Sequence, residues 1–261
     1  MSATEASLLT ALSQHLIDAH LNRSAVPADV VVPVLNGDAE SYAIQQQIIK
    51  ALQVPVAGWK VGAKSADSTP NGAPLPVGGI LKPGAIVKRS DYRPCGLELE
   101  IAFRFDRGFE PRATAYSDEE VWAGIGTMCT TIEVVASRYA AWPNVDKGAT
   151  LADLGSHAAL IVGESIPYRK DFPFLSPPLS FTIGDIDILQ TMLKGRSANT
   201  AGDPRRLLPW VVNHHTLVKG VPFKPDMIVT TGTFTGMYIP EQGGDVRGQI
   251  EGFPPIHFTL A

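Results

Sequence analysis

Cysteine is scarce in this chain: two occur among 261 residues, Cys95 and Cys129. Neither lies in a CxxC motif or a Cys/His cluster, so the sequence predicts no disulfide framework and no zinc-finger site, as is usual in a reducing cytosol. The chain also lacks an apolar run of about 18 residues, the length needed to span a bilayer. Its N-terminal segment has neither the cationic start nor the apolar stretch of a signal peptide. We therefore expect a soluble, cytoplasmic protein with no membrane partner.

Basic charge is scarce as well. The net charge is −4 and the isoelectric point is near 5.9, which leaves no basic field for nucleic acid. A small anionic substrate is compatible with this charge, because one bound metal ion reverses the local sign. The chain contains no GxxxxGK[ST] loop, GxGxxG after a strand, GxSxG elbow or HExxH helix. These absences argue against nucleotide-dependent enzymes, serine hydrolases of the elbow type and zinc proteases.

Two amphipathic helices are predicted at the N-terminal end. Apolar residues recur at helical spacing in the first, at Leu8, Leu12, Leu16 and Ala19. The second is predicted to begin with Asp38 as its N-cap. Its buried stripe comprises Ile44, Ile48 and Leu52. Residues 1–55 are therefore predicted to be a small helical annex, and residues 56–261 a catalytic core.

Strand patterns dominate the rest of the chain. Strands are predicted in segments 54–64, 96–106, 130–139, 158–163, 224–234 and 256–260, with a hairpin in 178–192 around Gly184–Asp185. Loops are predicted at 69–84, which is rich in Pro and Gly, and at 147–157. Ser117 and Glu120 form a capping-box signature for a helix through Ile125, and Asp203–Pro204 begin a helix that ends at Gly220. The fold class is predicted to be α+β, a β-rich core carrying the helical annex.

Glu98 and Glu100 are the most informative pair of residues. In the alternating segment 97–105 they share one strand face, with Cα atoms about 6.5–7 Å apart. Two carboxylates at that distance repel one another unless a positive charge lies between them. A hard cation such as Mg²⁺ or Mn²⁺ binds both, because it prefers oxygen ligands. The alternative is that this face is simply solvated.

Glu133 lies in the apolar segment Thr-Ile-Glu-Val-Val, where a solvated glutamate is less expected. A buried carboxylate needs a partner. That partner is either the same metal ion or a basic side chain such as Arg138. Three carboxylates on two strands would leave about half of an octahedral shell open for substrate and water.

Lys60 is the candidate proton carrier. It lies in Gly-Trp-Lys-Val-Gly, where the flanking glycines let other groups approach, and a desolvated lysine near a metal can have a lowered pKa. Asp153 and Ser156 are candidates for orienting substrate or water, although both residue types also simply form turns. His157 is a candidate for acid–base steps or a structural histidine. Of the adjacent His214 and His215, we expect one to be buried and one exposed.

Several ordered segments carry a resemblance to a known family. They are Gly-Trp-Lys-Val-Gly at 58–62, Gly-Leu-Glu-Leu-Glu-Ile-Ala-Phe at 96–103, Ile-Glu-Val-Val-Ala-Ser-Arg at 132–138, Ala-Asp-Leu-Gly-Ser at 152–156, Gly-Asp-Pro at 202–204 and Gly-Val-Pro-Phe-Lys-Pro-Asp-Met-Ile-Val-Thr-Thr-Gly at 220–232. From about residue 40 onward the chain resembles the fumarylacetoacetate hydrolase superfamily. More narrowly, it is similar to the 2-keto-4-pentenoate hydratase and 4-oxalocrotonate decarboxylase branch.

The resemblance implies a mixed-sheet core of the β-roll type and a site with Mg²⁺ or Mn²⁺. The metal ligands would be Glu98, Glu100 and Glu133, the family's lysine would be Lys60, and Asp153 with Ser156 would help to position substrate or water. In such enzymes a 2-oxo or 2-enol carboxylate chelates the metal, which polarises the carbonyl group. The resemblance also implies a homo-oligomer, which in related chains assembles with a hydratase or decarboxylase partner.

The chain departs from the family's pattern at three places. Ala136 replaces an aspartate in the strand after the third glutamate. Leu154 and Gly155 replace Asn-Ala in the loop that follows Asp153. After Lys64, the acidic residue expected before the next strand is missing, and the chain has Pro74, Leu75 and Pro76 there. The metal set is intact, so these departures affect the substrate and leave the metal prediction unchanged.

The first functional hypothesis is a hydratase that adds water to 2-hydroxypenta-2,4-dienoate, or a close analogue, in aromatic meta-cleavage catabolism. The nearest alternative is decarboxylation of 4-oxalocrotonate (2-oxo-3-hexenedioate), which cationic side chains deep in the pocket, such as Arg138 or Lys147, would favour. Two further alternatives are an acylpyruvate-type C–C hydrolase that uses His157 to activate water, and a non-catalytic partner subunit that takes up no metal.

Overall fold

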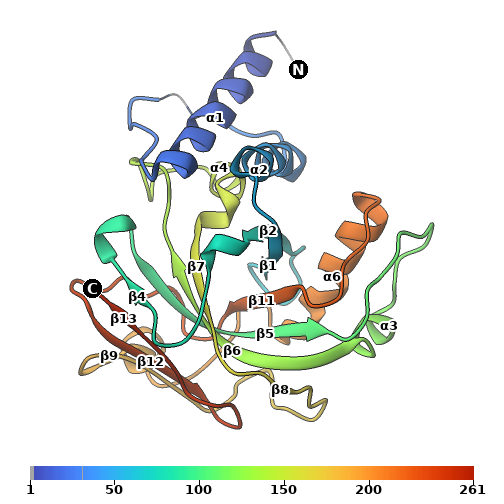
Figure 1. The fold of residues 1–261 in the computed structure, drawn as a ribbon, viewed down its shortest axis with the longest axis vertical. Helices are drawn as coiled ribbons and strands as arrows, with labels where there is room; N and C mark the ends of the chain where they lie inside the picture. The colour runs from blue at the N-terminus through green and yellow to red at the C-terminus, as the bar shows by residue number, and fades with distance from the viewer. Residues whose placement is uncertain (1–2, 31) are drawn as a thin grey trace.

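The computed structural model describes residues 3–30 and 32–261 (Figure 1). The strands in this part of the chain form two curved sheets. The larger sheet has the order β2 (Asn71–Pro76), β1 (Val56–Gly62), β11 (Ile228–Thr233), β5 (Gly96–Phe105), β6 (Ile125–Val135), β7 (His157–Val162) and β3 (Ile80–Leu81), and β8 (Ile166–Pro167) pairs with β6. The smaller has the order β10 (Ile186–Asp187), β9 (Leu179–Ile183), β12 (Gly244–Ile250), β13 (Ile256–Leu260) and β4 (Ile86–Val87).

Both sheets are mixed. The pairs β1–β11, β3–β7 and β4–β13 are parallel, and the other ladders are antiparallel. The α-helices are α1 (Ala3–Asn22), α2 (Asp38–Leu52), α3 (Asp118–Trp122), α4 (Lys147–Ala152), α5 (Ile188–Leu193) and α6 (Leu207–Asn213). Shorter helical turns are η1 (Val77–Gly79), η2 (Arg89–Asp91), η3 (Leu154–Ser156), η4 (Pro204–Arg206) and the π-turn η5 (His214–Val218). The predicted α+β class with a mixed-sheet core is confirmed.

The central strand β5 positions the candidate site. Its odd-numbered residues from Leu97 to Phe105 are at most 1% exposed and form part of the main apolar core. Burial of each such side chain contributes about 1.5–3 kcal/mol. The smaller sheet packs against this face, since a Cβ at Gly248 of β12 would lie 2.5 Å from Leu99 Cδ1. The opposite face of β5 carries the two glutamates, which are thereby turned away from the main core.

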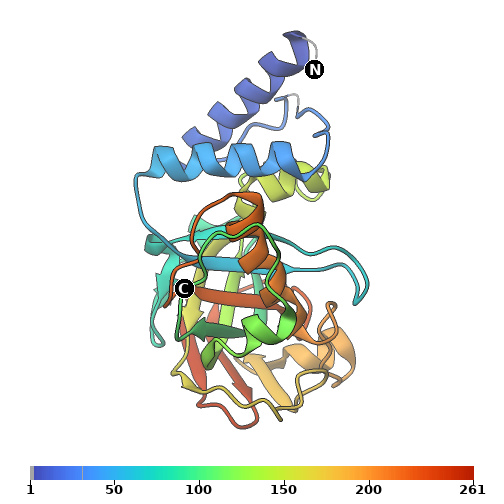
Figure 2. The same ribbon diagram turned by 90° about the vertical axis from the view of Figure 1, so that its right-hand side faces the viewer.

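The helices α1, α2 and α4 form a layer at one end of the molecule (Figure 2). The predicted apolar stripes are buried there, with Leu16 and Ile48 both 0% exposed. These residues share one cluster with Tyr139 and Leu154, which lie outside the predicted annex. Gln45 of α2 also forms hydrogen bonds to these segments: its Nε2 donates to the carbonyl oxygens of Leu151 and Gly72. Helices α1 and α2 are therefore packed directly on the segments that carry the candidate site.

The prediction of a loop at 69–84 was wrong. The segment contains strands β2 and β3 with η1 between them. β2 is an edge strand that pairs only with β1 among the described residues. Proline is tolerated on an edge strand, because its missing N–H removes no ladder hydrogen bond there. Pro74 and Pro76 therefore did not exclude a strand.

Other boundaries also differ from the predictions. Residues 147–152 form helix α4 where a loop was predicted, and the side chain of Asp146 caps it by accepting from Gly148 N at 2.8 Å. Helix α2 has Gly37 as its N-cap, so Asp38 is its first residue. Helix α3 has the predicted capping box but ends at Trp122, and β6 begins already at Ile125.

The C-terminal third confirms two further predictions. β9 and β10 form the hairpin around Gly184, and the side chain of Asp203 caps the helical segment that follows it by accepting from Arg205 N. Strand β12 was not predicted. None of the helices within residues 3–30 and 32–261 has the length and apolar character needed to cross a membrane.

Candidate metal centre

The register of β5 and β6 brings the three predicted glutamates together. Glu98 lies directly opposite Glu133 in the antiparallel ladder, and Glu100 lies opposite Thr131. One carboxylate oxygen from each of the three glutamates falls within 4.8 Å of the other two. Like charges directly opposite one another destabilise a sheet. The ladder therefore places at this point a cluster that needs positive charge.

Burial makes this repulsion stronger. Glu100 is 2% exposed, and Glu98 is partly buried. Burial, together with the nearby Glu133 charge, raises the pKa of Glu98 to about 7, although Lys60 opposes the rise. The same two causes and the Glu98 charge raise the pKa of Glu100 well above its ordinary value of 4.5. Glu100 Oε2 also accepts from the hydroxyl of Thr230 and from Gly232 N. These hydrogen bonds orient the carboxylate without neutralising it.

Glu133 is fully buried and is the charged member of the group. Its Oε1 lies 2.8 Å from Lys60 Nζ and 3.0 Å from His157 Nδ1. Burial by itself would raise the pKa of Glu133, but the charge of Lys60 and the hydrogen bond from His157 hold it below 4.5. Glu133 Oε2 has no hydrogen-bond partner among the described residues. The basic partner is thus Lys60, and the suggested pairing with Arg138 is wrong.

Lys60 projects from β1 next to this cluster. A Cβ at the preceding glycine, Gly58, would lie 1.9 Å from the carbonyl oxygen of Ile228, so the predicted close approach of another chain segment occurs here, between β1 and β11. Lys60 Nζ also donates to the carbonyl oxygen of Gly155 at 2.9 Å. Burial alone would lower the pKa of Lys60, but the charges of Glu133 and Glu98 outweigh it and raise the pKa. The lowered pKa suggested by the sequence is therefore not found, and Lys60 carries a proton.

Lys60, Glu98 and Glu100 line a cavity of about 350 Å³. Its wall also includes Lys64 and Lys147, two exposed lysines. Glu98, Glu100 and Glu133 supply three oxygen donors, and Oε2 of Glu133 has no partner in the part of the chain that the structure describes. Among the described residues, Lys60 is the one lysine or arginine that forms an ion pair with them. This donor set fits Mg²⁺ or Mn²⁺, which bind carboxylate oxygens and leave other positions for substrate and water.

Asp153 is not brought to this cavity. Its carboxylate is 0% exposed and accepts from Arg138 Nε at 2.6 Å and Arg138 N at 2.8 Å. His20 Nε2, from helix α1, lies 3.0 Å from Asp153 Oδ1. Burial would raise the pKa of Asp153, but Arg138 and the hydrogen bond to His20 lower it. The geometry around Asp153 is that of a completed ion-pair cluster.

Ser156 lies in the tight turn that follows Asp153. Leu154, Gly155 and Ser156 all have positive φ, at 46°, 60° and 57°. Left-handed backbone costs non-glycine residues about 1–2 kcal/mol each, and such strain tends to persist at functional sites. This turn directs the Gly155 carbonyl oxygen at Lys60. The hydroxyl of Ser156 is buried and has no partner among the residues that the structure describes.

His157 and Thr230 orient two of the glutamates, a role that the sequence analysis did not predict for either residue. His157 orients Glu133, which is the usual task of a hydrogen-bonding neighbour of a metal ligand. Burial, which outweighs the hydrogen bond to Glu133, lowers the pKa of His157. Thr230 orients Glu100 from the neighbouring strand. The partner of each residue depends on strand register, so local sequence carries no signal for either role.

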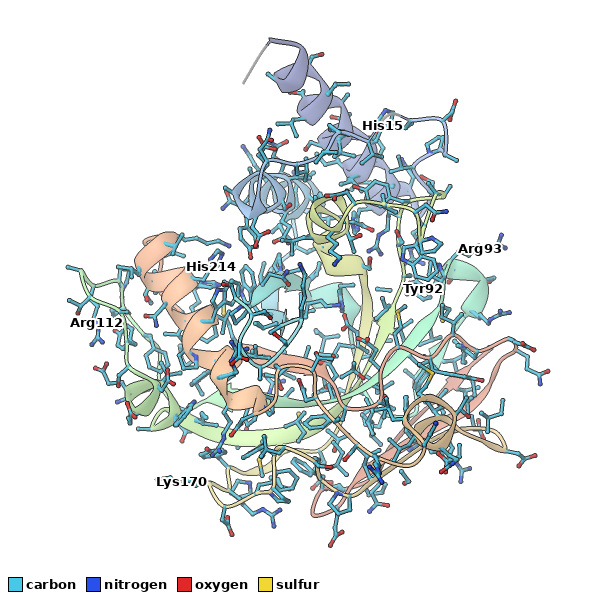
Figure 3. The ribbon with its side chains drawn as sticks, turned by 180° about the vertical axis from the view of Figure 1, so that it is seen from behind. His15, Tyr92, Arg93, Arg112, Lys170 and His214 are labelled. Carbon is cyan, nitrogen blue, oxygen red and sulfur yellow. The ribbon has the colours of Figure 1, made fainter. Side chains whose placement is uncertain are left out.

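His214 and His215 lie outside the site, and the prediction that one is exposed was wrong. Both are 7% exposed. His214 stacks on Trp210, with ring centroids 4.9 Å apart, and lies in η5, directly after α6 (Figure 3). His215 packs edge-on against Trp59 at 4.8 Å. Both histidines lie in the π-turn η5, in which Thr216 is also buried.

Comparison with known proteins shows which solved structures share the fold. No family model matches the sequence, and no curated protein matches it. The structure is similar to that of 4-oxalocrotonate decarboxylase from Pseudomonas putida G7, complexed with magnesium and adipate, with a TM-score of 0.78 and 18% identity over 100% of both chains. A second structure of that enzyme, with calcium and acetate, matches equally well.

More distant structures share the core. Fumarylpyruvate hydrolase from Pseudomonas aeruginosa, in complex with Mn²⁺ and pyruvate, has a TM-score of 0.56 and 14% identity over 80% of this chain and 90% of that one. The 2-hydroxyhepta-2,4-diene-1,7-dioate isomerase from Mycobacterium marinum has a TM-score of 0.56 and 18% identity over 80% and 76%. The chain therefore shares the fold of these structures, and the fold that the sequence resemblance implied is confirmed.

Proposed function

We propose that this chain is a divalent-metal-dependent lyase that acts on a small 2-oxo or 2-enol carboxylate. The leading reaction is decarboxylation of a 2-oxo-3-enedioate such as 2-oxo-3-hexenedioate. One observation carries the proposal: the three-glutamate cluster and the protonated Lys60 meet at one cavity whose wall also holds Lys64 and Lys147. This arrangement supports a chelating head group at one end of the substrate and a second carboxylate at the other.

Glu98, Glu100 and Glu133 would hold the cation through one oxygen each. The bound cation supplies a Lewis acid for the 2-oxo acid end of the substrate. With Lys60 it balances the charge of the three carboxylates, so the substrate brings the next negative charge into a neutral site. Glu133 receives further orientation from His157, and Glu100 from Thr230.

Lys60 is the proton carrier in this proposal. Its ammonium group has three N–H donors, two of which are directed at Glu133 Oε1 and the Gly155 carbonyl oxygen. The third remains for substrate. In the decarboxylation the C5–C6 bond breaks, CO₂ leaves, and the electron pair moves along the conjugated chain to the oxygen on C2. Lys60 supplies the proton that this oxygen gains.

Lys64 and Lys147 favour a dicarboxylate. Neither lysine forms an ion pair with another described residue. Adipate, the ligand of the similar decarboxylase structure, is also a six-carbon dicarboxylate. Because both lysines are exposed, solvent screens their attraction and they hold the distal carboxylate only weakly. Weak holding suits a group that must lose its charge as CO₂. Arg138, the other suggested cation, is occupied by Asp153.

Hydration of 2-hydroxypenta-2,4-dienoate, the first hypothesis from the sequence, is the second candidate. Asn71 and Thr150 line the same cavity as Lys60 and are partly buried. Their neutral polar groups suit a water molecule held beside the far double bond of a monocarboxylate. The acylpyruvate hydrolase alternative gains less support, because His157 does not line this cavity and its Nδ1 is directed at Glu133.

The partners stay proposals. A homo-oligomer, alone or with a related hydratase or decarboxylase, follows from the family resemblance. The non-catalytic alternative predicts no metal uptake, which a metal titration tests directly. In that reading the three-glutamate cluster would bind no cation.

Turnover of two substrates separates the candidate reactions. The protein would be supplied with Mg²⁺ or Mn²⁺ and with either 2-oxo-3-hexenedioate or 2-hydroxypenta-2,4-dienoate. We expect CO₂ release from the first to exceed loss of dienoate absorbance with the second. The opposite order would make the chain a hydratase, and no turnover of either substrate would contradict the proposed lyase.

Three variants assign the residues. Lys60→Met should lower kcat by about 10²–10⁴-fold, because the proton carrier is lost. Lys147→Gln should raise KM for the dicarboxylate about threefold with kcat retained, in line with an exposed ion pair. Lys82→Gln, at an exposed lysine outside the cavity, is the matched control and should leave both constants unchanged.

A further inference from the structure

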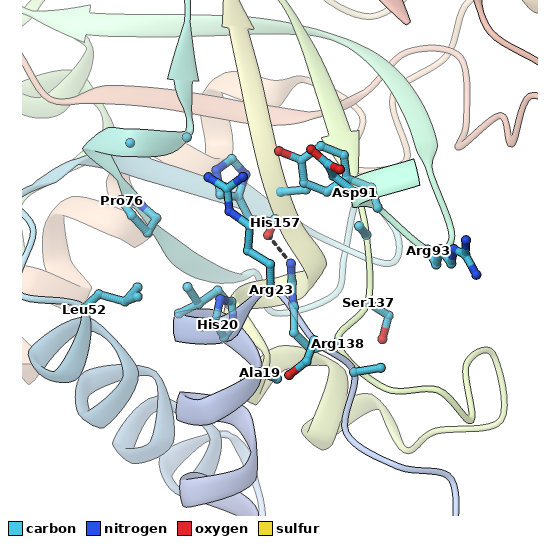
Figure 4. Close-up of a pocket in the computed structure, with 18 of the residues that line it drawn as sticks. Ala19, His20, Arg23, Leu52, Pro76, Asp91, Arg93, Ser137, Arg138 and His157 are labelled. Carbon is cyan, nitrogen blue, oxygen red and sulfur yellow. Dashed lines mark hydrogen bonds between the residues drawn. The ribbon is translucent and has the colours of Figure 1, made fainter. Parts of the chain in front are cut away.

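Two of the three glutamates are held by a neighbour that another side chain braces in turn. Glu133 is held by the ring of His157, and Nη1 of Arg138 donates to the carbonyl oxygen of His157 at 2.8 Å (Figure 4). Glu100 is held by Gly232, whose N–H donates to Glu100 Oε2 at 3.1 Å. The brace for Gly232 comes from a part of the chain that belongs to neither sheet.

A β-bulge in β11 directs the N–H of Gly232 at Glu100. Thr230 of β11 pairs with Ala102 of β5, and Thr233 pairs with Glu100. Two residues of β11 therefore lie opposite the single residue of β5 between these pairs. Gly232 is one of the two, and its φ of 75° lies in the left-handed region, which favours glycine. Bulges re-aim groups next to active sites, but they disrupt the ladder locally.

Asn199 braces this bulge from the connection between α5 and η4. Its Nδ2 donates to the carbonyl oxygens of Thr231 and Gly232, at 2.9 and 2.8 Å. Its Oδ1 accepts from Ala201 N at 2.9 Å, which fixes the orientation of the amide group. Asn199 is 7% exposed, and both N–H groups and the oxygen of its side chain are bonded within the protein. A buried amide that is satisfied in this way holds both peptide groups in one position.

The braced N–H limits the orientations that Glu100 can adopt. Oε2 of Glu100 accepts from Gly232 N and from the hydroxyl of Thr230, whereas its Oε1 forms no hydrogen bond with the described residues. Two donors on one carboxylate oxygen leave the other oxygen to a cation. Mg²⁺ demands near-ideal octahedral geometry, whereas Ca²⁺ accepts flexible geometry with longer bonds. A carboxylate that is held in one orientation therefore favours the smaller ion.

We propose that Asn199 is a positioning residue that sets the preference of the metal centre for Mg²⁺ over Ca²⁺. Gly232 and Thr233 of the bulge region line the metal cavity, but Asn199 does not. It acts on Glu100 through the backbone of Gly232, without touching the ion. The proposal rests on the metal centre proposed at Glu98, Glu100 and Glu133, and it adds a residue outside the cavity that determines which ion binds.

Calorimetric titrations of the metal-free protein with Mg²⁺ and with Ca²⁺ test this role. Asn199→Leu keeps the size of the side chain but removes the donors to both carbonyl oxygens. It should weaken Mg²⁺ binding about tenfold and Ca²⁺ binding less than about threefold, because Ca²⁺ tolerates a displaced carboxylate. Equal weakening for both ions, or no change for either, would overturn the proposal. A wild type that binds neither ion would overturn the metal centre as well, so the two failures are distinguishable.

Asn213→Ala is the matched control. Asn213 also bonds a backbone segment through its amide: Oδ1 accepts from Tyr116 N at 2.7 Å, and Nδ2 donates to Tyr116 O at 3.0 Å. Neither residue lines the metal cavity. The control should lower the melting temperature and leave the affinity for both ions unchanged. If thermal denaturation shows that Asn199→Leu is misfolded, Asn199→Ala, in which water can enter the vacated space, decides in the same titrations.

Hydrogen exchange at the Gly232 N–H tests the brace without any ion. In metal-free Asn199→Ala this N–H should exchange at least about tenfold faster than in the wild type. The N–H of Ile132, a fully buried residue of β6, reports the stability of the whole sheet and should accelerate less. An unchanged rate at Gly232, or an acceleration no greater than that at Ile132, would show that Asn199 only stabilises the fold and would overturn its positioning role.

Discussion

Two groups of buried carboxylates lie on either side of the turn at 154–156, and they differ in charge balance. At Asp153, one carboxylate meets the guanidinium and backbone N–H of Arg138 and the ring of His20. At the metal centre, three carboxylates meet one lysine, and Glu133 Oε2 has no partner among the described residues. The first group is complete within the chain, and the second requires a cation.

The pKa values follow this difference. Arg138 and His20 hold the pKa of Asp153 below its ordinary value despite burial, whereas burial and like charge raise the pKa of Glu98 and Glu100. A group with a lowered carboxylate pKa stabilises the fold at neutral pH, and one with a raised pKa destabilises it. Burial alone therefore does not distinguish the candidate metal ligands from Asp153. The difference is that the positive charge beside Glu98 and Glu100 is too small to balance the carboxylates.

The largest expected change in the free energy of unfolding is at the Asp153 group. Asp153→Asn should destabilise the protein by about 3–5 kcal/mol, because it leaves the buried charge of Arg138 without its partner. Chemical denaturation measures this. Asp245→Asn is the matched control: its partner Arg247 is 3.7 Å away and both side chains are more than half exposed, so the loss should stay below about 1 kcal/mol. Similar losses in the two variants would show that the Asp153 group is not a buried ion pair.

Removing a carboxylate charge at the metal centre should have the opposite effect and stabilise the metal-free protein. In metal-free protein at pH 8, Glu98→Gln should stabilise the fold by about 1–3 kcal/mol, because each unit of pKa shift corresponds to about 1.4 kcal/mol. The pKa of Glu98 is about 7 in the folded protein against an ordinary 4.5. Its contribution is therefore fully present below pH 4.5 and is lost as pH rises through 7.

Denaturation of metal-free wild type and Glu98→Gln across pH 4.5–8 measures this difference. The stabilising effect of the variant should grow with pH, and saturating Mg²⁺ should reverse its sign. Glu251→Gln, at an exposed glutamate, is the control. A Glu98→Gln protein that is less stable than wild type at pH 8 without metal would contradict the idea of an uncompensated cluster.

The smallest effect is expected at the edge of the complete group. His20→Gln should destabilise the protein by about 1 kcal/mol, the contribution of one hydrogen bond, because Arg138 still neutralises Asp153. His15→Gln, on the exposed face of the same helix, is the control and should change the free energy of unfolding by less than about 0.5 kcal/mol. A loss as large as that of Asp153→Asn would make His20 an equal partner in the ion pair.

Parts of the fold were visible in the sequence because they depend on local pattern. The period-two alternation at 97–105 predicted β5, and the stripes containing Leu16 and Ile48 predicted α1 and α2. Helix α4 was missed because it has only six residues, too few for a helical period to show, and contains Gly148, which disfavours a helix. Three of its residues are buried, and contacts with α2 and Tyr139 stabilise it.

The candidate site also combines features that local sequence predicts with features that depend on contacts between distant segments. The Glu98/Glu100 pair follows from one strand, but the position of Glu133 opposite Glu98 depends on the register of two strands. The partners of Asp153 lie 15 and 133 residues away along the chain. Local sequence patterns do not predict contacts between residues so far apart in the chain. The ion pair of Asp153 with Arg138 could therefore not be predicted from its position in a polar loop. The role of Asp153 in catalysis stays a prediction, and we propose that it positions the turn that holds Gly155 against Lys60.

Metal binding tests the central claim most directly. Calorimetric titration of the metal-free protein with Mn²⁺ should give one site per chain, with a rise in melting temperature on saturation. Glu100→Gln should weaken that site by at least about a hundredfold, since even residues that only orient metal ligands contribute 10–100-fold. Asp153→Asn, folded at low temperature, should retain it. No Mn²⁺ uptake by the wild type, or uptake that Glu100→Gln leaves unchanged, would contradict a metal centre at Glu98, Glu100 and Glu133.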